Sequence, residues 1–304
     1  MLLSKELLEQ YCNIIFSQRN ISPEYVEKDF YAVSLLKEIT SNASNIIFKG
    51  GTCLSKCFKI INRFSEDVDL SIIEEHLSES KRRKLVHETI EGSIKQIGLQ
   101  HKNPENIRSR RAFNRFICNY DRLSFSNGSA IEPNVIVELA MMSPCFPYET
   151  RKIQTFIGEY LDSVGKHDLT VQYGLEEFEI KVQKLERTFI DKIFALCDYQ
   201  ISKKITRQSR HIYDLYKIYP LITFDTNLLD LFEEVKKYRI DNPTCYSAKE
   251  GQKLNKIFND LINEETFLND YNELTYPLLY DRTPYNECIE TLNTIQKYLK
   301  ENNL

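Results

Sequence analysis

The residues best suited to chemistry are a Gly-Gly-Thr turn at residues 50–52 and an Asp-x-Asp pair, Asp67 and Asp69. The turn follows a short apolar run, and glycines at a strand-to-helix turn let backbone N–H groups approach phosphate oxygens. Two carboxylates in this spacing lie on one face of a strand, because the side-chain period is two. Such a pair suits hard divalent cations. We therefore predict a site for a nucleoside triphosphate and its metal ions.

Composition restricts the class of protein. The chain has 304 residues, of which 42% are apolar and 28% charged, which is typical of a soluble globular protein with one large or two smaller domains. The net charge of −4 means that any nucleic-acid surface must be a local patch. The sequence contains no apolar stretch of ~18 residues, so we expect no membrane span. The N-terminus lacks a signal-peptide pattern. We expect a cytoplasmic protein whose 8 cysteines are buried thiols.

The apolar pattern predicts the elements that position these residues. Helices are expected before residue 44, with a solvated Lys28–Asp29 pair on the second, and a strand is expected at 45–48. Thr52 is predicted to cap a helix that runs to Ile61. The remaining elements of this part are strands at 67–73, 113–123 and 134–142 and an amphipathic helix at 78–98 that carries four consecutive basic residues.

Glu138 is the one charged residue in a strand that is apolar on both faces. A buried carboxylate is costly without a partner, so we expect a cation beside it. From about residue 150 the pattern is helical. In this part Lys192 and Asp214 point inward from neighbouring helices, either as a structural ion pair or as members of the site. A basic run follows the first of these helices, and its candidates for contact with an RNA backbone are Lys203, Lys204, Arg207 and Arg210.

These elements predict an α+β fold. A small mixed sheet with N-terminal helices would form a nucleotidyltransferase core over residues 1–148, and a large helical domain would form residues 149–304, with the site in the cleft between them.

The chemistry that fits is two-metal phosphoryl transfer. Asp67 and Asp69 would hold the metals, Mg²⁺ or Mn²⁺, and Glu138 would be the third metal ligand and accept the proton of the attacking hydroxyl. The backbone of Gly50, Gly51 and Thr52 would bind the β- and γ-phosphates. The hydroxyls of Thr52 and Ser55 would assist, and Lys192 would neutralise the triphosphate.

Several motifs resemble those of the AbiEii/AbiGii-toxin-like nucleotidyltransferases, within the DNA polymerase β-like superfamily. The strongest is Lys-Gly-Gly-Thr-x-Leu-Ser-Lys at 49–56, followed by Arg-Phe-Ser-Glu-Asp-x-Asp-Leu at 63–70. Further matches are Glu-Lys-Asp-Phe at 27–30, the lysine motif at 187–196 and Arg-His-x-Tyr-Asp-Leu at 210–215. Two positions depart from the family pattern, Asp191 for a usual Glu and His211 for a usual Asp. The resemblance covers about residues 20–220.

The resemblance implies a nucleotide site at Gly51 and Thr52, metal carboxylates at Asp67 and Asp69, and an essential Lys192 and Asp214. Lys49, Arg63 and Ser65 lie in the same motifs and are further nucleotide-binding candidates. Such toxins transfer nucleotides from a nucleoside triphosphate to the 3′ end of tRNA. Many are paired with an antitoxin, and some act in phage defence.

Other functions remain open at this point. A nucleotidyltransferase of the same class could modify a protein or a small molecule. A non-catalytic nucleotide- or RNA-binding module would need no turnover, although Asp67, Asp69 and Lys192 are all present. An Asp-x-Asp glycosyltransferase is less consistent with the sequence, because it would not require inward-pointing Lys192 and Asp214.

Overall fold

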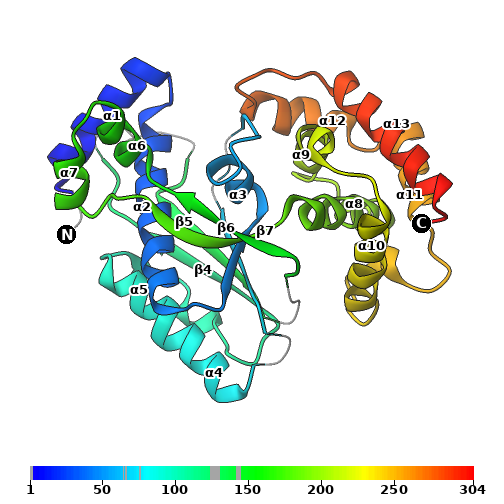
Figure 1. The fold of residues 1–304 in the computed structure, drawn as a ribbon, viewed down its shortest axis with the longest axis horizontal. Helices are drawn as coiled ribbons and strands as arrows, with labels where there is room; N and C mark the ends of the chain where they lie inside the picture. Colours follow the sequence, from blue (N-terminus) through cyan, green and yellow to red (C-terminus); the bar gives the residue numbers. More distant parts are fainter. Residues whose placement is uncertain (1–2, 64, 66, 75–76, 124–130, 142–144) are drawn as a thin grey trace. The chain divides into compact units, whose positions relative to one another are not determined.

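A computed structural model describes residues 3–63, 65, 67–74, 77–123, 131–141 and 145–304 (Figure 1). The chain forms two compact units. Unit 1 comprises Met1–Phe58 and Ser65–Gln183, and unit 2 comprises Lys59–Phe64 and Lys184–Leu304. The division along the chain therefore lies after residue 183, later than the predicted boundary at 148.

Unit 1 contains a seven-stranded mixed sheet with the order β3-β4-β5-β2-β1-β7-β6. β2 runs parallel to β5, and β1 runs parallel to β7, whereas the other neighbouring strands are antiparallel. The strands are β1 (Ile46–Lys49), β2 (Asp67–Ile72), β3 (Gln100–His101), β4 (Phe113–Asn119), β5 (Asn134–Ala140), β6 (Tyr148–Ile153) and β7 (Phe178–Gln183).

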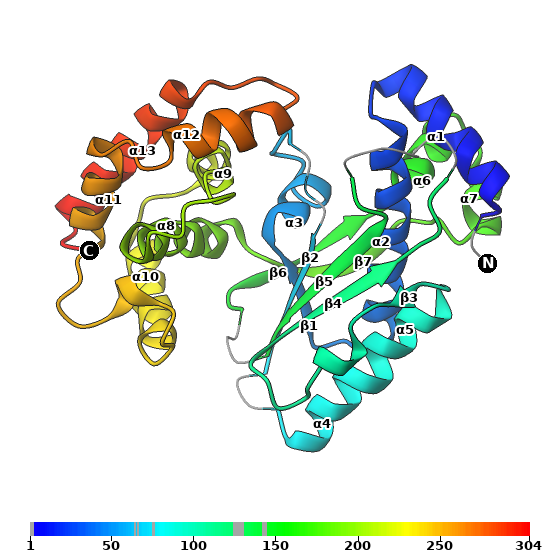
Figure 2. The same ribbon diagram turned by 180° about the vertical axis from the view of Figure 1, so that it is seen from behind.

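The buried residues of unit 1 show how its helices cover the sheet. Every second residue of β2 and β5 packs into one core with α2, the π-helical segment η1 and α5. A second core joins α1, α6 and α7 to the start of α2 (Figure 2). The helices are α1 (Lys5–Arg19), α2 (Pro23–Asn42), α3 (Gly50–Lys56), α4 (Glu79–Arg83), η1 (Lys84–Ile90), α5 (Glu91–Gln96), η2 (Pro104–Asn106), α6 (Phe156–Ser163) and α7 (His167–Gln172).

Unit 2 is helical. Its elements are α8 (Leu185–Ser202), α9 (Arg210–Ile218), η4 (Tyr219–Leu221), α10 (Thr226–Ile240), η5 (Tyr246–Ala248), α11 (Leu254–Asn263), α12 (Leu268–Asp270), η6 (Tyr271–Thr275), η7 (Tyr276–Leu278) and α13 (Tyr285–Glu301). Residues 59–63 join this unit although they follow α3 directly. The Asn62 N–H donates to the Tyr213 hydroxyl at 2.9 Å, and Tyr280 N–H donates to the Asn62 carbonyl at 2.8 Å.

The α+β class is confirmed, but several local predictions were wrong. The chain is not continuously helical after residue 150, because β6 and β7 complete the sheet. α3 ends at Lys56, and its N-cap is Lys49, so Thr52 lies inside the helix rather than capping it. Lys28 is buried, and the Asp29 side chain is only 7% exposed, so they are not a solvated surface pair.

Other sequence predictions agree with the described residues. All eight cysteines are buried thiols. No helix in the described ranges is both long and apolar enough to cross a membrane.

Candidate active site

Three carboxylates share one face of the unit 1 sheet. The intervening residues of β2 and β5, such as Val68 and Val137, are buried, whereas Asp67, Asp69 and Glu138 are partly exposed. The parallel pairing of the two strands places Asp69 directly opposite Glu138. Residues paired in this way point to the same side of a sheet, so the strand register brings all three predicted carboxylates onto one face. This face of β5 is partly exposed, contrary to the expectation of a strand buried on both faces.

Two basic residues flank these carboxylates. Lys49 of β1 pairs with Asp69, and Arg115 of β4 pairs with Glu138. The four side chains therefore form a row across β1, β2, β5 and β4 in which two acidic residues lie between two basic ones. Arg115 Nε lies 3.6 Å from Glu138 Oε1. We expected a cation beside Glu138 from the sequence, but the sequence did not indicate that Arg115 would supply it. Its position depends on the register of β4 against β5, which the alternation of apolar residues does not reveal.

Gly50 allows the start of α3 to lie against Asp69. Its φ of +77° is in the left-handed region, and a Cβ added here would come within 2.7 Å of Asp69 Cγ. A residue with a side chain would be strained and would displace the carboxylate. Position 50 therefore requires glycine for two reasons, the left-handed backbone of the turn and the close approach of Asp69, a predicted metal ligand.

The hydroxyls next to this turn bind protein atoms. Thr52 Oγ1 donates to the Asp67 carbonyl oxygen at 2.6 Å and lies 3.1 Å from Ser65 Oγ. Ser55 Oγ donates to the Thr52 carbonyl oxygen at 3.0 Å. Thr52 thus ties α3 to the first residue of β2, which positions the carboxylates. Contact of these hydroxyls with phosphate stays a prediction.

A buried ion pair supports α3 from behind. Lys56 Nζ lies 2.7 Å from Asp29 Oδ1 and 3.8 Å from the centroid of the Phe156 ring. The Phe156 N–H donates to the other Asp29 oxygen at 2.7 Å. Burial raises the pKa of Asp29, and Lys56 opposes that rise. The Glu-Lys-Asp-Phe motif therefore has a structural use, because it connects α2 with α3 and with the start of α6.

Unit 2 holds a separate charged cluster around Asp214, which is fully buried. Arg63 binds the Asp214 carboxylate with two hydrogen bonds, from Nε to Oδ1 at 2.7 Å and from Nη2 to Oδ2 at 2.8 Å. Lys192 Nζ donates to Oδ2 at 2.6 Å. The predicted Lys192–Asp214 pair is present, but the sequence did not indicate that Arg63 joins it. Arg63 lies only four residues before Asp67 and yet belongs to the other unit.

This cluster has a net positive charge, because two cations surround one carboxylate. Burial alone would raise the pKa of Asp214, but Arg63 and Lys192 outweigh it and hold that pKa well below its usual range. Burial lowers the pKa of Lys192, with Asp214 opposing and Arg63 reinforcing the change. His211 stacks on Tyr199, and its Nδ1 lies 3.4 Å from Lys192 Nζ. Burial, together with Lys192 and Arg210, lowers the pKa of His211 well below its ordinary value.

The predicted RNA-contact residues occupy the loop that follows α8 and the start of α9. Lys203, Lys204 and Arg207 are exposed, and Arg210 is half-buried. Lys203 Nζ lies 3.5 Å from Glu264 Oε2, an exposed pair that contributes little to stability. The segment therefore presents basic groups to solvent in unit 2.

The carboxylate face suits a hard divalent cation by its donor atoms. Among the described residues, no group of three or more acidic, histidine or cysteine side chains already has the geometry of a metal cage. Mg²⁺ is commonly held by one or two carboxylates together with substrate phosphates. Asp67 and Asp69 meet that requirement, with Glu138 beside them.

Gly50→Ala tests the close approach. Gly98 has nearly the same φ, +75°, but a Cβ there would meet nothing within 4 Å, so it is the matched control. We expect Gly98→Ala to cost about 1 kcal/mol from backbone strain alone. Gly50→Ala should cost about 2–4 kcal/mol, because Asp69 must also move. Urea denaturation measures both values, and equal costs would refute the proposed role of Gly50.

His211 predicts a pH-dependent stability. Folding keeps the ring neutral, whereas the unfolded chain takes up a proton below about pH 6.5. The unfolded state then binds more protons, so stability falls as the pH falls. Between pH 7.5 and 5.5 the His211 contribution should cost about 1 kcal/mol. Chemical denaturation across this range should show a flatter profile for His211→Asn. A His211→Asn slope equal to that of the wild-type chain would contradict the assignment.

Comparison with known proteins identifies the family of the chain. The model of the nucleotidyl transferase AbiEii toxin family, of type IV toxin–antitoxin systems, matches residues 34–299. MenT4, a nucleotidyltransferase toxin from Mycobacterium tuberculosis, has a similar structure, with a TM-score of 0.57 and 17% identity over 98% of this chain and 90% of that one. A candidate nucleotidyltransferase from H. pylori gives a TM-score of 0.44 and 15% identity over 90% and 94%. No curated protein matched. The chain belongs to the AbiEii nucleotidyltransferase toxin family.

Proposed function

We propose that this nucleotidyltransferase moves a nucleoside monophosphate from a nucleoside triphosphate to the 3′-hydroxyl of tRNA. The observation that carries the proposal is the shared face of Asp67, Asp69 and Glu138, next to the Gly50 turn. In the reaction, the acceptor oxygen forms a bond to the α-phosphorus, and the bond from this phosphorus to the bridging oxygen breaks. The proton of the hydroxyl passes to a carboxylate, and pyrophosphate leaves.

Each residue of the face has a proposed role. The backbone N–H groups at Gly50, Gly51 and Thr52 bind phosphate oxygens, and Lys49 adds positive charge at the end of the row. Asp67 and Asp69 would hold Mg²⁺ or Mn²⁺, which when bound stabilises negative charge on the transferring phosphoryl group. Glu138 accepts the proton of the acceptor hydroxyl. Arg115 beside it orients the carboxylate.

The cluster in unit 2 is proposed to serve the triphosphate. Arg63 alone can satisfy both oxygens of Asp214, so the stability of that carboxylate does not depend wholly on Lys192. The second cation leaves a net positive charge in the cluster, which is the charge that a triphosphate or departing pyrophosphate requires. Lys192 is therefore assigned to the reaction, with Asp214 and Arg63 fixing its position.

The acceptor and the biological setting are proposed by analogy with the family. Lys203, Lys204, Arg207 and Arg210 are proposed contacts to the RNA backbone. Type IV toxin–antitoxin membership implies an antitoxin that restrains the enzyme, and a role in phage defence is consistent with such a pair. Transfer to a protein or to a small molecule is the alternative, and the assay below distinguishes between them.

The first test is to incubate the protein with each of the four nucleoside triphosphates in labelled form, total RNA and a protein lysate, to determine which fraction takes the label, and to sequence RNA 3′ ends. We expect one or a few added nucleotides on tRNA. Asp67→Asn and Asp69→Asn should lower transfer about 10³-fold or more, since several kcal/mol of transition-state stabilisation is lost. Their melting temperatures should match that of the exposed-site control Asp121→Asn. Label found only in protein, or undiminished transfer by both variants, would refute the proposal.

The second test separates catalysis from stability in unit 2. Lys192→Met keeps most of the side-chain volume, and Arg63 still pairs with Asp214, so unfolding free energy should change by less than about 1 kcal/mol while transfer is lost. Asp214→Asn leaves two buried cations without their counter-charge and should cost about 3–5 kcal/mol. Denaturant titration and the transfer assay measure the two effects. A strongly destabilised Lys192→Met with full transfer would show that Lys192 is only structural.

A further inference from the structure

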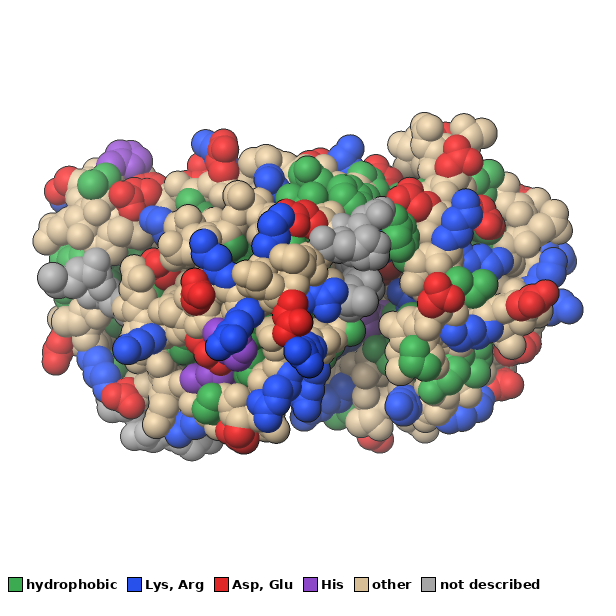
Figure 3. All heavy atoms as spheres, turned by 90° about the horizontal axis from the view of Figure 1, so that it is seen from below, with side chains coloured by type: hydrophobic (Ala, Val, Ile, Leu, Met, Phe, Trp, Pro, Cys, Tyr) green, Lys and Arg blue, Asp and Glu red, His purple; other side chains and the backbone are tan. Residues whose placement is uncertain are grey.

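A second basic region lies in unit 1 and extends to Arg115 at the end of the carboxylate row. Residues 78–115 contain 10 Lys and Arg but only 4 Asp and Glu, a net charge of 10 − 4 = +6 in a chain whose total is −4. These residues form α4, η1, α5, β3 and the loop before β4. Figure 3 views the molecule from the side of α4 and shows many Lys and Arg side chains on that face, with Asp and Glu side chains among them.

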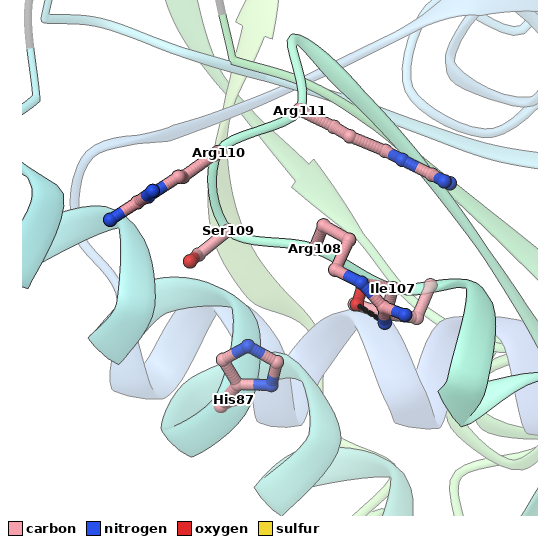
Figure 4. A pocket seen from close by; sticks show the side chains of 6 residues that line it. All are labelled: His87, Ile107, Arg108, Ser109, Arg110 and Arg111. Atoms are coloured by element: carbon pink, nitrogen blue, oxygen red, sulfur yellow. Dashed lines mark hydrogen bonds between the residues drawn. The ribbon is translucent and has the colours of Figure 1, made fainter.

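The loop at residues 107–111 forms a hollow of about 540 Å³ with His87 of η1. Figure 4 shows the His87 ring on its helix below the loop, with the side chains of Arg110 and Arg111 extending in opposite directions. Arg108, Arg110 and Arg111 are exposed. Three guanidinium groups around one concave surface can bind the oxygens of more than one phosphate group.

Among the described residues, two of the three loop arginines are held by uncharged backbone groups. Arg108 Nη1 donates to the Ile107 carbonyl oxygen, and Arg111 Nη1 donates to that of Asn106, both at 2.7 Å. Backbone carbonyls carry no net charge, so they orient these guanidinium groups without neutralising them. Arg110 pairs with Glu79 at 2.8 Å, but both side chains are more than half exposed, and such a pair is weak.

The loop and the strand that follows it are held in place by side-chain hydrogen bonds of two asparagines. Asn114, which is 2% exposed, accepts from the Arg108 N–H at 2.9 Å and donates to the Arg108 carbonyl oxygen at 3.0 Å. Asn103 accepts from the Ile117 N–H and donates to the Arg115 carbonyl oxygen. The arginines are therefore presented from a fixed backbone, which lowers the entropic cost of binding a ligand.

The same loop leads directly to the carboxylates. It continues into β4, where Phe113 and Arg115 lie on the face that carries Glu138. Phe113 is 48% exposed, and the Arg115 side chain is 51% exposed. An exposed aromatic ring between a basic hollow and an acidic site resembles the combination used for single-stranded nucleic acid, in which bases stack and cations follow the backbone.

We propose that this basic face, defined as Lys81–Lys84, the loop at 107–111 and Arg115, binds the sugar–phosphate backbone of the RNA acceptor, and that Phe113 stacks on a base close to Glu138. The assignment rests on the proposed RNA acceptor. RNA fits better than a membrane surface, because the hollow is concave and an exposed ring adjoins the acidic face. Direct hydrogen bonds from arginine to phosphate would position the RNA without selecting its sequence.

The test measures RNA binding without any nucleoside triphosphate, so its result does not depend on transfer. The variant Arg108→Gln/Arg110→Gln/Arg111→Gln is compared with Lys237→Gln/Lys297→Gln/Lys300→Gln, which removes three exposed positive charges from α10 and α13. Fluorescence anisotropy with labelled bulk tRNA is recorded over a range of salt concentrations. We expect the arginine variant to bind at least about tenfold more weakly, with a slope of log K against log salt that is shallower by about 2 to 3.

A second measurement tests whether a base stacks on Phe113. Phe113→Ala should weaken binding of a short single-stranded RNA by about 5- to 150-fold, the usual effect of losing one stacked base. Arginine and control variants with equal affinity for tRNA would overturn the proposal, as would wild-type binding to acidic lipid vesicles but not to tRNA. Loss of tRNA binding in the arginine variant alone would support the basic face even if sequencing showed no transfer to tRNA, in which case only the proposed acceptor would fail.

Discussion

The candidate site depends on one constraint, the parallel pairing of β2 with β5 that places Asp69 opposite Glu138. Carboxylates side by side on a strand face repel each other unless positive charge is near. Lys49 and Arg115 supply it from the two flanking strands. The close approach of α3 depends on the same arrangement, because only glycine at residue 50 leaves room for the Asp69 carboxylate. Strand register, flanking charge and turn geometry thus support one another.

Unit 2 solves a different electrostatic problem. Asp214 is taken completely out of water, and burial of a lone carboxylate would cost several kcal/mol. Arg63 offsets that cost through two hydrogen bonds in a planar fork, which lysine cannot make. Lys192 then adds a second cation at the same carboxylate. The short segment at residues 59–63 carries Arg63 into this unit before the chain returns to β2 of unit 1.

The net charge of the whole chain does not reveal where its basic residues are concentrated. The whole chain is acidic, yet its basic residues concentrate in two places, at residues 78–115 of unit 1 and around α8 and α9 of unit 2. Electrostatic attraction to a polyanion depends on such local density, because charges more than about 10 Å apart are screened at physiological salt. A nucleic-acid acceptor is therefore compatible with an overall charge of −4.

The sequence by itself determined the local features. Side-chain period two put Asp67 and Asp69 on one strand face, and helical spacing turned Lys192 and Asp214 inward, since these patterns depend only on nearby residues. Only the tertiary structure decided which distant residues meet. Arg115 beside Glu138, Arg63 on Asp214, Asp29 on Lys56 and the last two strands of the sheet all depend on contacts between segments far apart in the chain. Local periodicity contains no information on register between strands or on which unit a short connecting segment joins.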